Sequence, residues 1–347
     1  MVCLFYILLF IMYILSTNWH GYNACKPHSG KYILWGTMTI ELKAGPDDAG
    51  RRLDRILRKC LPDYSLSLIH RLLRQGKVLV NDRQAGPNKR IEPDMMIQIK
   101  LAVNHNREQV NNSPDAANPT LSLPEILWRG SGIIIFNKPT GLASHGKDSM
   151  NTLVNAWLTG KLPASLSFKP GPLHRLDRPT SGIIAFSESL QGAQLFTRLL
   201  RERKIKKTYL AIVEGSVSGD QEWQDVLSRD TTLKKTFTGN RATETQDALT
   251  TVKMLASNGS YSLIEAHIIT GRTHQIRAQA ASHGHPLAGD IKYGGHRVPG
   301  GDFFLHAWKM ELEEGFEGFP QPLIAPFPEA FRSQIDILFK QNEKFSP

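Results

Sequence analysis

The spacing of apolar residues predicts two short helices within residues 38–101. Apolar side chains recur every three to four positions in two stretches. The first stretch contains Leu53, Ile56, Leu57 and Leu61, and the second contains Leu68, Ile69, Leu72 and Leu73. Pro62 ends the first predicted helix, and Ser65 or Ser67 can cap the start of the second. Gly76 suits the C-terminal cap of the second helix.

Strand-like segments account for most of the remaining pattern. Residues 77–81 and 95–100 alternate between apolar and polar positions. After a stretch rich in Asn and Pro, further strand-like runs occur between a few helical stretches, at Gly132–Phe136, Gly182–Phe186, Tyr209–Val213 and Tyr261–Ile269. An α+β fold follows. We expect an N-terminal extension, a small domain, a flexible linker and a larger domain, over residues 1–37, 38–101, 102–120 and 121–347.

The N-terminal extension begins with an apolar run, Met1–Leu15, that has no preceding Lys or Arg. It is a poor signal peptide and is shorter than the roughly 20 residues of a membrane span, so we expect no stable membrane association, with an inner-membrane anchor as the less favoured alternative. We expect translation to begin at Met38, where a soluble pattern starts. The three cysteines, Cys3, Cys25 and Cys60, lack the paired spacing of a zinc site or a disulfide framework, which favours a reducing compartment such as the cytoplasm.

The charge balance points to a polyanionic partner. Among 347 residues, Lys and Arg outnumber Asp and Glu by 42 to 32, and such a positive surface attracts nucleic acid. Basic residues gather on the polar sides of the two predicted helices, where they form either a phosphate-binding surface or a merely solvated one. They are Arg51, Arg52, Arg55, Arg58, Lys59, His70, Arg71, Arg74 and Lys77.

The densest group of chemically capable residues is HRLDRPTSG, residues 174–182, in which Asp177 stands between Arg175 and Arg178. A neighbouring guanidinium keeps a carboxylate ionised and therefore nucleophilic. An Asp flanked by Arg residues is also typical of a structural ion pair, so spacing alone leaves both interpretations open. A hydrolase built from Ser181, His174 and Asp177 is disfavoured, because three residues of one tight loop cannot readily aim at one another.

Two parts of the chain resemble known families. Residues 51–60 (RRLDRILRKC) and 65–82 (SLSLIHRLLRQGKVLVND) are similar to the small αL-type RNA-binding domain of a ribosomal small-subunit protein. Residues 174–182 resemble the signature loop of the RluA family of pseudouridine synthases. Other segments resemble further motifs of that family in the expected order, namely 137–145 (NKPTGLASH), 207–215 (KTYLAIVEG), 270–277 (TGRTHQIR), 289–294 (GDIKYG) and 305–307 (LHA).

The resemblance implies an α+β catalytic domain with a mixed, mainly antiparallel sheet, and roles for individual residues. Asp177 would be the catalytic carboxylate, Arg277 the basic residue that pairs with it, and Tyr209 a ring for base stacking and proton transfer. Residues expected to shape the loop or bind substrate are His174, Arg175, Arg178, Thr180, Arg272, His274 and Gln275. The binding module would use Arg51, Arg52, Arg55, Arg71, Arg74 and Lys77. Isomerisation involves no redox change, so we expect no cofactor, and we expect no metal because the sequence has no metal-ligand spacing such as CxxC or HExxH.

The implied function is conversion of specific uridines to pseudouridine, with a target nucleotide flipped out of its helix. Large-subunit ribosomal RNA is the expected substrate, and transfer RNA is an alternative. A non-catalytic RNA-binding or ribosome-assembly factor is the other alternative, and the presence of Asp177 argues against it. We expect a monomeric cytoplasmic isomerase that binds RNA.

Overall fold

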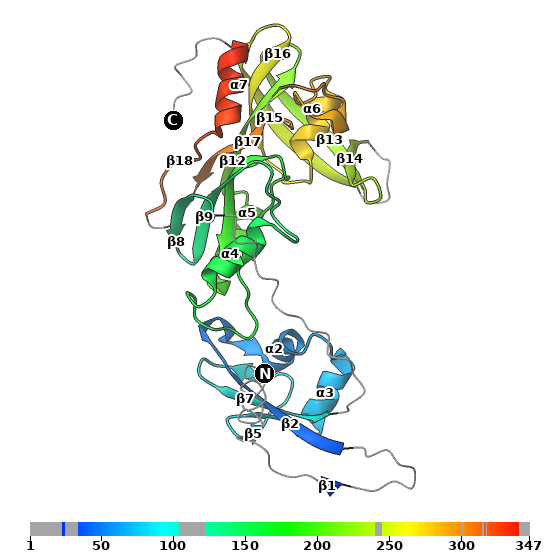
Figure 1. The fold of residues 1–347 in the computed structure, drawn as a ribbon, viewed down its shortest axis with the longest axis vertical. Coiled ribbons are helices and arrows are strands. Elements are labelled where there is room, and N and C mark those ends of the chain that lie inside the picture. Colours follow the sequence, from blue (N-terminus) through cyan, green and yellow to red (C-terminus); the bar gives the residue numbers. More distant parts are fainter. Residues whose placement is uncertain are drawn as a thin grey trace, which may run out of the picture. The chain divides into compact units, whose positions relative to one another are not determined.

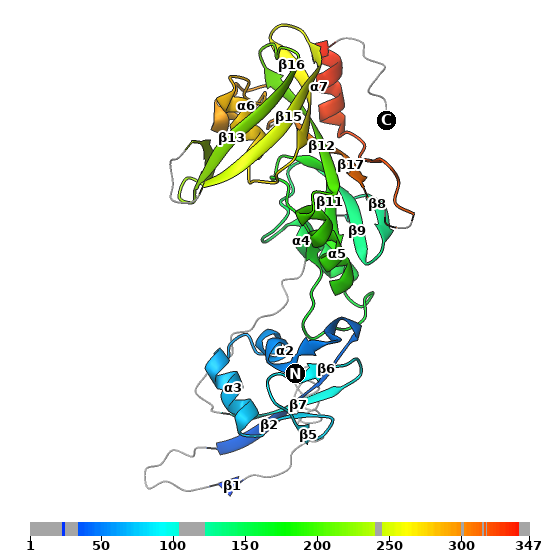
Figure 2. The same ribbon diagram turned by 180° about the vertical axis from the view of Figure 1, so that it is seen from behind.

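The chain contains two compact units, seen from opposite sides in Figures 1 and 2. The computed structural model describes residues 23–24, 34–103, 122–239, 245–299, 302–313, 316 and 318–339. The first unit comprises Met1–Asp115 with Pro163–Ser167, and the second comprises Ala116–Leu162 with Phe168–Pro347. Most of the predicted N-terminal extension and almost all of the predicted linker lie outside the described residues. No helix in the described ranges is long and apolar enough to cross a membrane.

Both predicted helices of the first unit are present, as α2 (Leu53–Cys60) and α3 (Leu66–Arg74). Of the two candidate caps for α3, Ser65 is the one used, since its hydroxyl accepts a hydrogen bond from the Leu68 amide at 3.3 Å. Gly76 follows α3 with a φ of 67°, the left-handed conformation that closes a helix.

The helices of the first unit pack on a small sheet with the strand order β1-β2-β7-β4-β5. The strands are β1 (Asn23–Ala24), β2 (Leu34–Lys43), β4 (Val78–Val80), β5 (Arg83–Gln84) and β7 (Met96–Val103). A separate pair is formed by β3 (Arg51–Arg52) and β6 (Arg90–Ile91). The sequence predicts β4 and β7. It does not predict β2, which pairs with β7 across more than fifty residues of chain.

The buried carboxylate of Asp48, at the end of the 3-10 helix η1 (Pro46–Asp48), binds residues 165–167, which belong to the first unit. It accepts hydrogen bonds from the amides of Leu166 and Ser167, at 2.8 and 2.9 Å. Burial alone would raise the pKa of Asp48, but these bonds and others outweigh it and lower the pKa. Gly45 fits here because a Cβ would collide with the Ala164 carbonyl.

The second unit is built on one sheet with the strand order β14-β13-β15-β16-β12-β17-β11-β9-β8, with β10 beside β11 and β18 beside β17. The strands are β8 (Ile126–Gly130), β9 (Ile133–Lys138), β10 (Gly171–Pro172), β11 (Ser181–Ser187), β12 (Ile205–Glu214), β13 (Asp220–Asp230), β14 (Lys235–Thr238), β15 (Thr245–Ser257), β16 (Tyr261–Ile268), β17 (Leu305–Leu312) and β18 (Leu323–Ile324). Among these strands only β11 and β17 pair in parallel. The predicted α+β fold with a mainly antiparallel sheet is confirmed, and the four predicted runs fall on β9, β11, β12 and β16.

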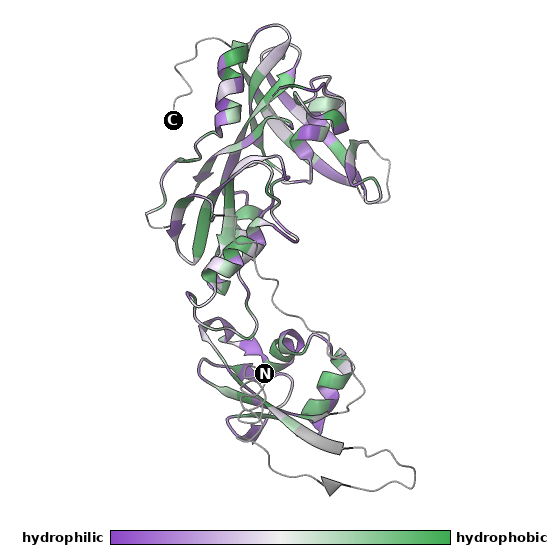
Figure 3. Cartoon of the chain, in the orientation of Figure 1, coloured by the Kyte–Doolittle hydropathy of each residue, from purple (hydrophilic) through white to green (hydrophobic). Residues whose placement is uncertain are grey.

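Helices lie against the sheet (Figures 1 and 3), and most residues of β12 are buried. Tyr209 and Ala211 belong to the core that also contains α4 (Met150–Leu158) and α5 (Leu190–Arg201). The alternate residue Leu210 packs in a second core with α7 (Glu329–Phe339). Such burial of successive strand residues in different cores follows from the two-residue period of a strand.

Three segments that are distant in sequence meet beside the middle of this sheet. The loop over residues 173–180 leads into β11, and Gly182 lets β11 approach β17 closely, since a Cβ there would lie 2.2 Å from the Ala307 carbonyl oxygen. The strand β12 runs next to β17. The helix α6 (Gln275–Ser282) follows β16 and packs near η2 (Ile291–Tyr293).

Candidate active site

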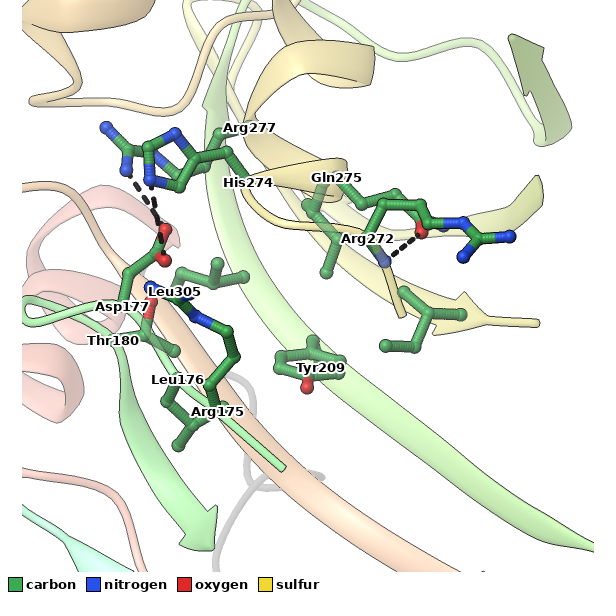
Figure 4. Close-up of a pocket in the computed structure, with 12 residues that line it drawn as sticks. Arg175, Leu176, Asp177, Thr180, Tyr209, Arg272, His274, Gln275, Arg277 and Leu305 are labelled. Atoms are coloured by element: carbon green, nitrogen blue, oxygen red, sulfur yellow. Dashed lines mark hydrogen bonds and ion pairs between the residues drawn. The ribbon is translucent and has the colours of Figure 1, made fainter. Parts of the chain in front are cut away.

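Asp177 lies in the loop before β11, with its carboxylate facing His274, at the N-cap of α6, and Arg277, in the first turn of that helix (Figure 4). Its Oδ2 is 3.0 Å from Nη1 of Arg277, and its Oδ1 is 3.6 Å from Nε2 of His274. The Asp177 side chain is 13% exposed. The carboxylate is therefore ion-paired but still open to a small molecule.

Arg277 is fixed from the side opposite Asp177. Its Nε and Nη2 donate to the two oxygens of Asp290 at 2.7 and 2.9 Å. The guanidinium also lies over the rings of Tyr293 and Phe303, 4.8 and 4.2 Å from their centroids. Burial lowers the pKa of Arg277, but the bonds to Asp290 and Asp177 outweigh it and raise the pKa above its usual value. The guanidinium is thus permanently charged and aimed at Asp177.

A buried lysine holds the Asp177 loop. Lys138, at the end of β9, donates to the carbonyls of Pro139, Leu142 and Arg178 at 2.9, 2.7 and 3.2 Å. Burial lowers the pKa of Lys138 to about 7, whereas the nearby Asp177 raises it. Three carbonyl acceptors use all three N–H donors of the ammonium form.

Tyr209 presents its ring from β12 beside the same loop (Figure 4). Its neighbours across the sheet are small, Ala266 on β16 and Ala307 on β17. Its hydroxyl has no hydrogen-bond partner among the described residues. Burial raises the pKa of the Tyr209 phenol and the negative charge of Asp177 raises it further, so the phenol is neutral at physiological pH.

Three adjoining hollows meet at Asp177, and all three are lined by Arg175, Asp177 and His274. The smallest, of about 60 Å³, also contacts Tyr209 and Thr180. The larger two have volumes of about 370 and 500 Å³, and Tyr209 lines the first of these. Clefts of roughly 300–1,000 Å³ are typical of small-molecule sites, so the space around Asp177 is sufficient for a nucleotide.

The residues near Asp177 in its loop differ in exposure and in the hydrogen bonds they already make, and therefore in their availability to a substrate. Nε2 of His174 accepts the Ala185 amide at 3.1 Å, and burial lowers the pKa of His174 to about 3, so this ring is neutral and anchors the loop to β11. Arg175 is exposed. The buried hydroxyl of Thr180 has no partner among the described residues and lines the smallest hollow. Arg178 donates to the Gly141 carbonyl at 2.8 Å and lines the largest hollow.

The side-chain amide of Gln275, at the start of α6, forms hydrogen bonds with other residues of the chain. Oε1 of Gln275 accepts from Thr270 and from the Arg272 amide, at 2.7 and 3.0 Å, while its Nε2 donates to Leu249 and Thr250. A side-chain amide makes about four hydrogen bonds, so the expected substrate contact of Gln275 gives way to a structural role.

Arg272 and His274, from the turn into α6, line the hollows. Nε of Arg272 donates to the Asp247 carbonyl at 3.2 Å, and Nδ1 of His274 lies 2.9 Å from the Tyr293 hydroxyl. His274 has a left-handed φ of 55°. Burial lowers the pKa of His274 to about 4, which leaves the ring uncharged near neutral pH.

The basic residues of the first unit divide into two groups. Those of the helices and the following turn are exposed, and they are Arg55, Arg71, Arg74 and Lys77. Arg51 and Arg52, expected on the polar side of a helix, instead form β3 ahead of α2. Arg52 makes an ion pair of 2.7 Å with Asp54, and Arg51 donates to the Ser167 hydroxyl at 3.0 Å. The contacts of these two arginines lie within the chain.

Comparison with known proteins identifies the family to which this site belongs. The family model for RNA pseudouridylate synthase matches residues 132–282, and that for the S4 domain matches residues 51–97. Ribosomal large subunit pseudouridine synthase D of Neisseria meningitidis serogroup A is 32% identical over 324 residues, which cover 87% of this chain and 81% of that protein. The chain belongs to the RluA family of RNA pseudouridine synthases. It is accordingly an isomerase, and the family and the αL-type (S4) domain predicted from sequence are confirmed.

Other relatives agree with this membership. Ribosomal large subunit pseudouridine synthase C of Escherichia coli K12 is 30% identical over 308 residues, covering 84% of this chain and 94% of that protein. The solved structure of human RNA pseudouridylate synthase domain containing 1 is 20% identical, covers 63% of this chain and 91% of its own, and superposes with a TM-score of 0.50. That structure supports the fold of the second unit.

Asp290 and Lys138 were missed as site residues in the sequence, although both lie in segments that match family motifs, 289–294 and 137–145. Neither stands near Asp177 along the chain. Their roles depend on the tertiary contacts that bring them to Arg277 and to the Arg178 carbonyl. Their position within these two motif segments is the sequence signal that could have identified Asp290 and Lys138 as site residues.

Proposed function

We propose that this enzyme isomerises uridines of large-subunit ribosomal RNA and that Asp177 is its nucleophile. The observation that carries this proposal is the Asp177 carboxylate, ion-paired with Arg277 at 3.0 Å and facing hollows that Tyr209 also lines. In the reaction the C1′–N1 bond of uridine breaks, the freed uracil turns, and a C1′–C5 bond forms as the C5 proton leaves. A carboxylate bonded to one fragment prevents its loss while the base turns.

The neighbouring side chains provide complementary functions. Arg277, held by Asp290, pairs with the carboxylate and orients it without itself reacting. The Tyr209 ring supplies a stacking surface for the uracil, and its neutral hydroxyl can donate a hydrogen bond. The Thr180 hydroxyl, which has no partner among the described residues, and the exposed Arg175 are among the polar groups available to the nucleotide.

Access to Asp177 requires that the target nucleotide leave its helical stack. A stacked uridine cannot present its glycosidic bond to a carboxylate in a hollow, and extrusion costs roughly a few kcal/mol. Phosphate contacts from the exposed Arg55, Arg71, Arg74 and Lys77 would help to offset that cost. A tethered binding module also raises the local concentration of RNA at the catalytic residues.

The choice of substrate rests on relatives and on charge. The similar proteins of Neisseria meningitidis and Escherichia coli bear the name ribosomal large subunit pseudouridine synthase. The net charge of +10 suits a polyanionic substrate. We assign residues 38–101 to RNA binding, 102–120 to a linker and 121–347 to catalysis, in a monomeric protein of the cytoplasm.

Mapping of pseudouridine across total RNA tests the proposal. Cells lacking the gene should lose pseudouridine at particular positions of large-subunit ribosomal RNA, and wild-type protein should restore it while an Asp177→Ala variant of equal abundance should not. Loss of sites in transfer RNA alone would refute the proposed target. Equal restoration by Asp177→Ala would refute the proposed nucleophile.

A further inference from the structure

Lys207 is a half-buried lysine of the second unit that takes no part in the contacts of Asp177. It lies two residues before Tyr209 on β12, so the two side chains project from the same face of the sheet. Both line the cleft of about 370 Å³ that Asp177 borders. The Lys207 ammonium lies near the turn into α6, where a Cβ built on Gly271 would be 3.5 Å from Nζ.

This ammonium makes no ion pair or hydrogen bond with the described residues. The adjacent Lys206 projects from the other face of the strand and lies 3.9 Å from a carboxylate oxygen of Glu313. Burial lowers the pKa of Lys207 to about 8. Because withdrawing a charge from water is costly unless a partner compensates it, a half-buried ammonium without a partner is a candidate site for an anionic ligand.

The other charges of the cleft make an anion the fitting partner. Positive side chains line it together with Lys207, and they are Arg175, Arg203 and Arg272. Its one carboxylate, Asp177, is already paired with Arg277. His174, which also lines the cleft, is uncharged near neutral pH because burial lowers its pKa to about 3. A neutral uracil cannot neutralise this cluster, whereas a phosphodiester carries one negative charge and two acceptor oxygens.

We propose that Lys207 binds a phosphodiester of the RNA next to the flipped uridine, in the cleft it shares with Tyr209. This inference rests on the proposed function, because it takes the base to stack on Tyr209. Two residues of strand separate the side chains by roughly 7 Å. The base and an adjoining phosphate of one nucleotide can therefore occupy the two positions together. Lys207 is a substrate-binding residue in this account, and it fixes the backbone while the base turns.

The test removes single phosphate charges from the RNA. Short RNAs spanning a mapped target uridine, labelled with tritium at C5, are made with one neutral methylphosphonate linkage at each position around that uridine. For the wild-type enzyme, one linkage next to the target should lower kcat/KM for tritium release by about 10-fold to 100-fold. For Lys207→Met, the unmodified RNA should lose a similar factor, and a methylphosphonate at that linkage should cause no further loss.

Matched variants separate loss of the proposed phosphate contact from the effects of losing any lysine of this strand. Lys206→Met, which removes a lysine from the opposite face of the same strand, should keep the wild-type response at every linkage. Lys207→Arg should retain the sensitivity that Lys207→Met loses. Because Lys207→Met removes a half-buried charge that has no partner, its melting temperature should equal or exceed that of the wild type.

Two results contradict the account in distinguishable ways. If Lys207→Met remains sensitive to the same linkage as the wild type, or if no linkage next to the target affects the wild type, the phosphate site is refuted while the proposed function stands. If the wild-type enzyme isomerises no uridine of large-subunit ribosomal RNA, the proposed function fails first and this inference fails with it.

Discussion

The carboxylate of Asp290 holds the guanidinium of Arg277 through two hydrogen bonds, of 2.7 and 2.9 Å, and both side chains are buried. The remaining nitrogen, Nη1, is the one that reaches Asp177. The paired geometry fixes the plane of the guanidinium and therefore the place where Asp177 finds its counter-charge. Asp290 acts on the carboxylate only through Arg277, which makes it a positioning residue.

Replacement of Asp290 tests whether it orients Arg277 toward Asp177. Asp290→Asn keeps the volume but removes the charge and one acceptor, so Arg277 should lose its fixed orientation. Because small misplacements of a reacting group cost about 100-fold in rate, kcat should fall by about 10-fold to 100-fold while KM changes little. Steady-state tritium release with circular dichroism as a folding check measures both. A rise in KM with unchanged kcat would mean that Asp290 serves RNA binding instead.

The ring and the hydroxyl of Tyr209 can be separated by two substitutions. Tyr209→Phe keeps the stacking surface and should retain most of the RNA affinity. Tyr209→Ala removes the ring, and a base-stacking contribution of about 1–3 kcal/mol predicts roughly 5-fold to 150-fold weaker binding of the target RNA. Titration of labelled RNA with each variant gives the comparison. Equal affinity of the Ala and Phe variants would exclude stacking on this ring.

The sequence predicted the elements whose signals are local. The helices α2 and α3 followed from apolar spacing with Pro62, Ser65 and Gly76 at their ends, and all of these were confirmed. Strand β11 likewise stands out as an apolar run. Strand β2 was missed, because it is stabilised by a partner strand that lies far away in the chain.

The site was predicted as a set of residues but not as a set of contacts. Motif resemblance named Asp177, Arg277 and Tyr209, which the structure brings to one group of hollows. It could not reveal that Asp290 fixes Arg277, since an ion pair between buried side chains leaves no periodic trace in sequence. It also assigned Gln275 to the substrate, whereas four contacts within the chain occupy that amide.

Acid sensitivity should follow from the buried His306. Its Nδ1 is 2.8 Å from the Ser181 hydroxyl and its Nε2 is 3.2 Å from the Ala325 carbonyl oxygen. Burial lowers the pKa of His306 from 6.5 to about 4, although the bond to Ala325 opposes this shift. Below pH 6.5 the unfolded chain therefore gains a proton that the folded chain excludes, and stability falls between pH 6.5 and pH 4.

This single histidine should account for about 3 kcal/mol of unfolding free energy over that range. Urea unfolding at pH 7.5, 6.0 and 5.0 measures the slope. His306→Gln should be less stable at pH 7.5, because it disturbs two buried hydrogen bonds, but its stability should depend less on pH. The same pH slope in both proteins would contradict the assignment.

In the proposed mechanism the carboxylate of Asp177, paired with Arg277, reacts with uridine. The most direct measurement is tritium release from [5-³H]uridine-labelled, unmodified large-subunit ribosomal RNA by purified wild-type and Asp177→Asn protein, with melting temperatures recorded for both. This mechanism requires stoichiometric release at the target uridines by the wild type and none above background for a folded Asp177→Asn variant. Release by Asp177→Asn at a rate similar to that of the wild type would contradict it.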